Sequence, residues 1–242
     1  MYVSRFLEVC TLPLINECLW FGVARLTQRA FASDGCHTAC MSVERKALFI
    51  FLGVTLAECC WFFSFWGAAP RHVVHWFGLD RLGGVALPAW AGAAGVAFAY
   101  SYYARRLPSV RQTMFRFNLL KWVAIGLAIA AALCEEGVFR KTIMNVLQNH
   151  GVGTVLQVIV SGLSFGLAHS VWGLMKGSLR AAMAAMVATG VMGTALAIVY
   201  LLAGRNVWPC VVSHFLITAT IEPGLVLSAL RGEMGRISSK PA

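Results

Sequence analysis

Runs of about twenty apolar residues recur along this chain and constrain its fold more than any other feature. Two of them, at 47–66 and 84–104, are almost uninterrupted. A helix of about 20 apolar residues crosses the hydrocarbon core of a bilayer and bonds its backbone polar groups internally. Only 12% of the residues are charged, whereas a soluble domain has about 25%. The pattern excludes an ordinary soluble domain and predicts an all-α polytopic membrane protein.

The spacing of the apolar runs predicts seven or eight transmembrane helices in a single integral membrane domain that covers 1–242. The segment 6–23 contains Glu8, Asn16 and Glu17, so it fits either a first span or a helix on the membrane surface. We expect 67–83 and 105–120 to be connections and 149–153 to be a turn. The expected spans are 6–23, 47–66, 84–104, 121–148, 154–174, 181–203 and 207–227.

The basic residues of the chain predict its orientation. A net charge of +10 could indicate nucleic-acid binding, but the Lys and Arg residues fall between the apolar runs and form no single basic face. With alternating sides, 14 of them fall on one side and 6 on the other. The positive-inside rule then places the C-terminus in the cytoplasm. We expect a bacterial inner-membrane protein that contacts the lipid bilayer and binds no nucleic acid.

Most of the cysteines lie in apolar surroundings. Six of the eight fall within apolar runs, which is typical of buried thiols. Cys36 and Cys40, with His37 between them, fall in a connection and could form a disulfide or a metal site. One C-x-x-x-C with one histidine is a weak metal pattern. We therefore expect no metal and no other cofactor.

Two adjacent carboxylates, Glu135 and Glu136, lie within the apolar segment 121–148. Placing an ionised carboxylate at that depth costs roughly 2.5–3.5 kcal/mol, so such groups have partners or line a watery cavity and commonly serve a function. On a helix, Glu136 and Arg140 are four residues apart and can pair. Glu135 points about 100° away. The sequence therefore predicts one tethered carboxylate and one free carboxylate.

Two histidines occur inside later apolar segments. His169 follows Phe165 by one helical turn, and His214 precedes Thr218 by one turn. Measured from the turn near His150, Glu135 lies about 22 Å and His169 about 28 Å along straight helices. His214, nine residues after Arg205, comes to only about 13 Å. A meeting of the three groups therefore requires a tilt, a kink near Pro209 or another helix boundary.

The chemistry that suits these groups is hydrolysis. A glutamate shielded from bulk solvent can take a proton from water, and imidazoles can orient that water or stabilise an oxyanion. No nucleophilic side chain is needed. Residue type alone leaves a metal open, because Glu135, His169 and His214 could all be ligands.

The order of the motifs resembles a known family. Over about 120–222, the chain is similar to the CAAX protease and bacteriocin-processing family of intramembrane glutamate proteases. The matching positions are Glu135-Glu136-x-x-x-Arg140, Phe165-x-x-x-His169 and His214. The resemblance implies a helical intramembrane endopeptidase, a hydrolase that acts on a membrane-associated peptide or protein.

The resemblance also implies roles for individual residues. Glu135 would activate water, His169 would assist it, and His214 would help to form the oxyanion site. The expected supporting residues are Glu136, Arg140, Phe165 and Thr218. Thr218 departs from the family pattern, which usually has asparagine or aspartate there, because a hydroxyl has less reach than an amide.

Two other interpretations stay open. The departure at Thr218 favours a non-catalytic immunity or scaffold protein of the same fold. Gly162-x-Ser164-x-Gly166 matches the nucleophile-elbow pattern. The second interpretation is therefore a serine intramembrane protease that uses Ser164. The elbow needs a strand-to-helix turn, and this apolar stretch predicts a helix instead.

Overall fold

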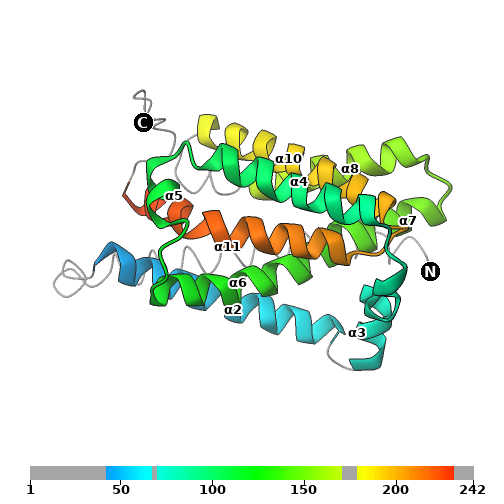
Figure 1. The fold of residues 1–242 in the computed structure, drawn as a ribbon, viewed down its shortest axis with the longest axis horizontal. Coiled ribbons are helices and arrows are strands. Elements are labelled where there is room, and N and C mark those ends of the chain that lie inside the picture. Colours follow the sequence, from blue (N-terminus) through cyan, green and yellow to red (C-terminus); the bar gives the residue numbers. More distant parts are fainter. Residues whose placement is uncertain (1–41, 67–69, 171–178, 232–242) are drawn as a thin grey trace.

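The structure is a computed structural model that describes residues 42–66, 70–170 and 179–231. The secondary structure of these residues is helical, so the all-α class is confirmed for them (Figure 1). The predicted first span at 6–23 and the candidate Cys36–Cys40 site lie outside the described residues. The helices are α2 (Val43–Trp66), α3 (Pro70–Phe77), η2 (Leu79–Gly84), α4 (Leu87–Ala104), α5 (Pro108–Thr113), α6 (Leu119–Glu136), η3 (Gly137–Ile143), α7 (Met144–Asn149), α8 (Thr154–His169), α10 (Leu179–Leu202) and α11 (Trp208–Leu230).

Four segments of the described residues are long and apolar enough to cross a bilayer. They are Val43–Ser64, Leu119–Asn149, Ala182–Leu202 and Trp208–Leu230. A fifth span results if Val73–Gly84 and Leu87–Ala104, which are bent by 112°, are counted as one. These helices make the chain an integral membrane protein. The predicted total of seven or eight spans stays a prediction.

Two segments expected to be connections contain helices. Residues 70–84 form α3 and η2, and 108–113 form α5. The prolines suggested loops, but Pro70 and Pro108 are the first residues of α3 and α5, where the fixed proline φ and the missing N–H suit a helix start. Gly78, with φ of 76°, makes the turn between α3 and η2. Within the predicted span 154–174, α8 ends at His169, and 171–174 lie outside the described residues.

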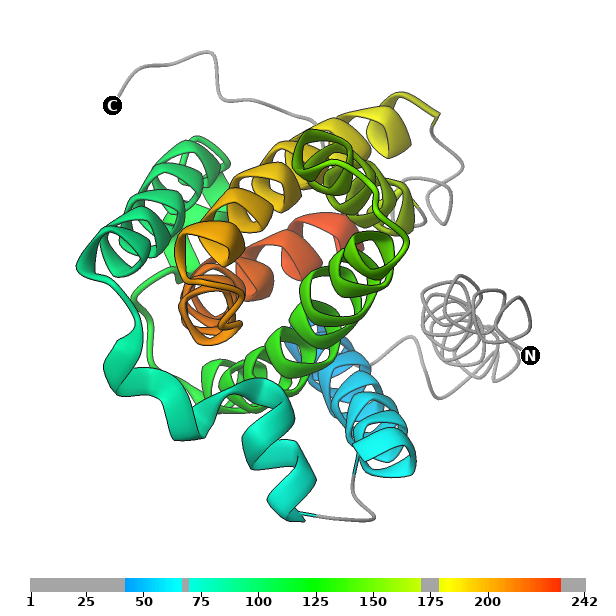
Figure 2. The same cartoon turned by 90° about the vertical axis from the view of Figure 1, so that its right-hand side faces the viewer.

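Helix α11 lies at the centre of the arrangement (Figures 1 and 2). It packs against α2, α4, α5, α6 and α10. It begins with Pro209 in its first turn and buries Ile217 and Ile221 in the main apolar cluster. Because α6 also packs on α11, the two carboxylates of α6 and the histidine of α11 belong to one interface.

Helices α8 and α10 approach unusually closely. A Cβ added at Gly162 would overlap the Thr194 hydroxyl, and one at Gly166 would lie 2.9 Å from the Gly190 Cα. Glycines four residues apart allow two membrane helices to pack backbone to backbone. This packing presses the α8 face that carries Phe165 against Gly193 of α10.

Candidate active site

The two carboxylates stand where the central helix changes its winding. Helix α6 ends at Glu136, and the chain continues without a break into η3, a π-helical segment. The Thr142 hydroxyl donates to the Gly137 carbonyl five residues earlier, 2.9 Å away, which follows the π pattern. Short π segments inside α-helices are frequent at functional sites. Here the segment carries Arg140 directly after the carboxylates.

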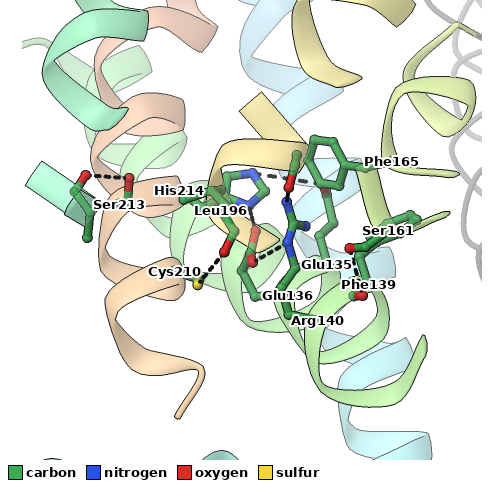
Figure 3. A network of polar contacts seen from close by, with 12 residues as sticks. Glu135, Glu136, Phe139, Arg140, Ser161, Phe165, Leu196, Cys210, Ser213 and His214 are labelled. Atoms are coloured by element: carbon green, nitrogen blue, oxygen red, sulfur yellow. Dashed lines mark hydrogen bonds and ion pairs between the residues drawn. The ribbon is translucent and has the colours of Figure 1, made fainter. Parts of the chain in front are cut away.

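Glu136 is tethered, and its partner is Arg140. The Arg140 Nε lies 3.1 Å from the Glu136 Oε2, and both side chains have no exposed surface (Figure 3). The Arg140 Nη2 donates to the Gly193 carbonyl of α10 at 3.1 Å, and the guanidinium carbon lies 4.5 Å from the centre of the Phe165 ring. The ion pair therefore connects α6 and η3 to both α8 and α10.

His214 joins the two carboxylates from α11. Its Nδ1 lies 2.8 Å from the Glu136 Oε1, and its Nε2 lies 3.8 Å from the Glu135 Oε2. An ionised carboxylate can only accept hydrogen bonds, so the Nδ1 carries a hydrogen and donates it to Glu136. The Nε2 is the ring nitrogen that faces Glu135. Glu136 thus fixes the orientation of His214.

His169 approaches Glu135 from α8. Its Nδ1 lies 2.9 Å from the Phe165 carbonyl and donates to it, so its Nε2 is directed at Glu135. The distance from that Nε2 to the Glu135 Oε2 is 3.6 Å. The His169 ring stacks on Phe165 with centroids 4.5 Å apart. One backbone bond and one aromatic contact therefore hold this imidazole.

Glu135 is the free carboxylate of the cluster. Among the described residues, no group donates a hydrogen bond to its Oε2. Distances of 3.6 and 3.8 Å to the two imidazoles exceed a direct hydrogen bond and suit groups that share one water molecule. The side chains of Glu135 and His169 are 9% and 18% exposed, whereas those of Glu136 and Arg140 are fully buried. The accessible edge of the cluster is therefore at His169.

The three predicted groups meet. The calculation with straight helices had placed His214 closer to the end of its helix than Glu135 and His169 are to the turn near His150. Helix α11 begins at Trp208 and contains Pro209 in its first turn, so no kink at that proline is involved. Part of the difference comes from η3, because a π-helix bonds each residue to the fifth rather than the fourth before it. More residues per turn shorten the distance from Glu135 to the turn at His150.

Thr218 and Ser164 are the two other positions to which the sequence analysis gave a possible role. Thr218 is half-buried on α11, one turn after His214. The Ser164 hydroxyl donates to the carbonyls of Val160 at 2.7 Å and Ser161 at 3.1 Å, both in its own helix. Gly162 and Gly166, which complete the apparent elbow pattern, make the contact of α8 with α10 instead.

Several supporting contacts were not found from the sequence. The Ser161 hydroxyl donates to the Phe139 carbonyl at 3.0 Å and joins α8 to η3. The Ser213 hydroxyl donates to the Ala93 carbonyl at 2.8 Å and fixes α11 against α4 next to His214 (Figure 3). The series of small residues in α8 was the sequence feature that could have indicated the contact made by Ser161. In the part of the chain that the structure describes, no three His, Cys, Asp or Glu side chains form a group that could hold a metal ion.

Comparison with known proteins gives one match. Residues 117–220 match the family model described as Rce1-like type II CAAX prenyl endopeptidase. The match begins just before α6 and ends within α11, so it includes Glu135, His169 and His214. It confirms the resemblance expected from the sequence. No curated protein and no solved structure matches the chain.

Proposed function

We propose, from this match to a family of CAAX prenyl endopeptidases, that the chain is an intramembrane endopeptidase in which Glu135 activates the attacking water. The observation that carries the proposal is the position of one carboxylate oxygen, within 3.6 Å of one imidazole nitrogen and 3.8 Å of another. The imidazoles come from two other helices. The substrate would be a membrane-associated peptide or protein.

The first chemical step would form a tetrahedral intermediate. Glu135 takes a proton from water while the water oxygen attacks the carbonyl carbon of the substrate. The His169 Nε2 helps to orient that water. The electrons of the carbonyl double bond move to its oxygen, and the His214 Nε2 stabilises this oxyanion when it carries a hydrogen. Thr218 can add one hydroxyl donor in that region.

The second step would break the peptide bond. The intermediate collapses, the C–N bond breaks, and the proton held by Glu135 passes to the leaving nitrogen. Glu136 and Arg140 take no proton in this sequence of events. They keep the His214 ring in place through the 2.8 Å contact between the Glu136 Oε1 and the Nδ1. This division of roles gives the tethered and the free carboxylate different tasks.

The positions of Ser164 and its flanking glycines support the glutamate mechanism over the serine alternative. A nucleophilic serine needs a base within hydrogen-bond reach. The Ser164 hydroxyl instead donates to two carbonyls of its own helix. A Ser164→Ala variant is therefore expected to keep its activity.

The proposal is tested with a Glu135→Gln variant of the full chain. Purified protein in detergent micelles is incubated with a peptide library, and new termini are identified by mass spectrometry. Loss of a general base lowers the rate by about 10²–10⁴-fold, so Glu135→Gln should lose nearly all cleavage. The matched control is Glu44→Gln, which removes an exposed carboxylate near the start of α2. Equal cleavage by wild type and Glu135→Gln would overturn the mechanism, and a non-catalytic scaffold would cleave nothing in any form.

A further inference from the structure

One acidic residue of the central helix α11 has no place in the proposed reaction. Glu222 lies on α11, two turns after His214, and is half-buried. A carboxylate in the middle of a span is costly and generally marks a functional position. Among the described residues, no hydrogen bond or ion pair involves this carboxylate. Its acceptor capacity is therefore available to a bound molecule.

The position of Glu222 relates it to the site of cleavage. Residues His214, Thr218 and Glu222 follow at intervals of four along one side of α11. The Ser101 and Thr220 hydroxyls lie 3.2 Å apart and fix α4 against α11 at this level. Glu222 thus lies along the helix face that begins at the catalytic cluster.

Lys121 and Arg140, the buried cations of the described residues, have other partners. The Lys121 Nζ donates to the Met114 carbonyl at 2.8 Å and to the Thr220 carbonyl at 3.4 Å. Arg140 pairs with Glu136 at 3.1 Å. Neither cation contacts Glu222. Among the described residues, no Lys, Arg or His side chain forms an ion pair with the Glu222 carboxylate.

We propose that Glu222 determines specificity by binding a Lys or Arg side chain of the substrate. Eight residues of α11 separate it from His214, or about 12 Å. An extended peptide advances about 3.3 Å per residue, so the basic residue would lie three or four positions from the cleaved bond. A cation and a carboxylate in a water-poor site form strong charge-assisted hydrogen bonds. This inference rests on the proposed endopeptidase function.

The test compares the cleavage preferences of wild type, Glu222→Gln and Glu222→Lys in the full-length protein. Each is incubated with the same peptide library, and the residues on both sides of every cut are counted. Wild type should show Lys and Arg enriched three or four positions from the cut. One lost charge-assisted hydrogen bond lowers kcat/KM by about tenfold, so Glu222→Gln should lose this enrichment. Glu222→Lys should favour Asp and Glu there instead.

Two controls separate this inference from the function on which it rests. Glu44→Gln should keep the wild-type preference, and Glu222→Gln should lose more rate on peptides with Lys or Arg at that position than on peptides with a neutral residue there. Cleavage by wild type without any preference for basic residues overturns the role of Glu222 and leaves the endopeptidase standing. Retention of the preference in Glu222→Gln does the same. Absence of cleavage by wild type overturns both.

Discussion

Replacing Arg140 by methionine should destabilise the protein more than almost any other single change at a charged residue. The methionine keeps an apolar chain of similar length but removes the guanidinium. Glu136 would then remain as a fully buried carboxylate whose one close partner among the described residues is His214 at 2.8 Å. The bond to the Gly193 carbonyl and the contact with the Phe165 ring would be lost as well.

The magnitude follows from those contacts. Removing one member of a buried ion pair costs about 3–5 kcal/mol. A loss of 1 kcal/mol lowers Tm by roughly 2–4 °C in a chain of 150–250 residues. The expected decrease in Tm is therefore about 6–20 °C. The Tm of Arg140→Lys should lie between those of Arg140→Met and wild type, because lysine keeps the positive charge but lacks the planar guanidinium and its stacking on Phe165.

The assay is thermal unfolding of the purified protein in one detergent, followed by size-exclusion chromatography. Arg111→Met serves as the control, because Arg111 is exposed on α5 and its loss removes the same charge from the surface. Its Tm should stay within about 2 °C of wild type. A Tm for Arg140→Met as close to wild type as that of the control would refute the reasoning.

The remaining predictions concern the packing of α8 and the histidine of α11. Gly166→Val should lower Tm, because its side chain would meet the backbone of α10 and overpacking costs about 1–3 kcal/mol. Gly126→Ala, in open space on α6, should instead raise stability by up to about 1 kcal/mol, and equal Tm values for the two variants would contradict the close approach. His214→Gln should lower kcat by about 10²–10³-fold, as measured with a cleaved library peptide. Substrate binding by His214→Gln should change little. An unchanged kcat would contradict the proposed role of His214 at the oxyanion.

The sequence predicted which polar groups come together better than it predicted the segments around them, because Glu135 lies 3.6 Å from His169 and 3.8 Å from His214. Glu135, His169 and His214 stand out because charged and imidazole groups are rare in apolar runs, and that signal needs no knowledge of helix boundaries. The Glu136–Arg140 pair follows from helical spacing, and it is present. The calculated difference in level between Glu135 and His214 was too large, in part because a straight α-helix was assumed for 137–143, where η3 is π-helical.

Other features have no local signal of their own. Helices α3 and α5 are short and begin at Pro70 and Pro108, which are equally common in turns. The contact of Arg140 with the Phe165 ring depends on how closely α8 and α10 pack. Gly162 and Gly166 carry that information, but in the sequence they also fit the elbow pattern around Ser164. Only their position against α10 separates the two interpretations.

Helix α8 stops at His169 after 16 residues, or about 24 Å, which is less than the roughly 30 Å of a hydrocarbon core. The last carbonyls of any helix lack partners within it, and lipid tails offer none. Here the His169 Nδ1 donates a hydrogen bond to the Phe165 carbonyl, and the Ser170 hydroxyl donates one to the Leu167 carbonyl at 2.7 Å. His169, whose Nε2 is directed at Glu135, therefore also satisfies a carbonyl at the end of the helix that carries it.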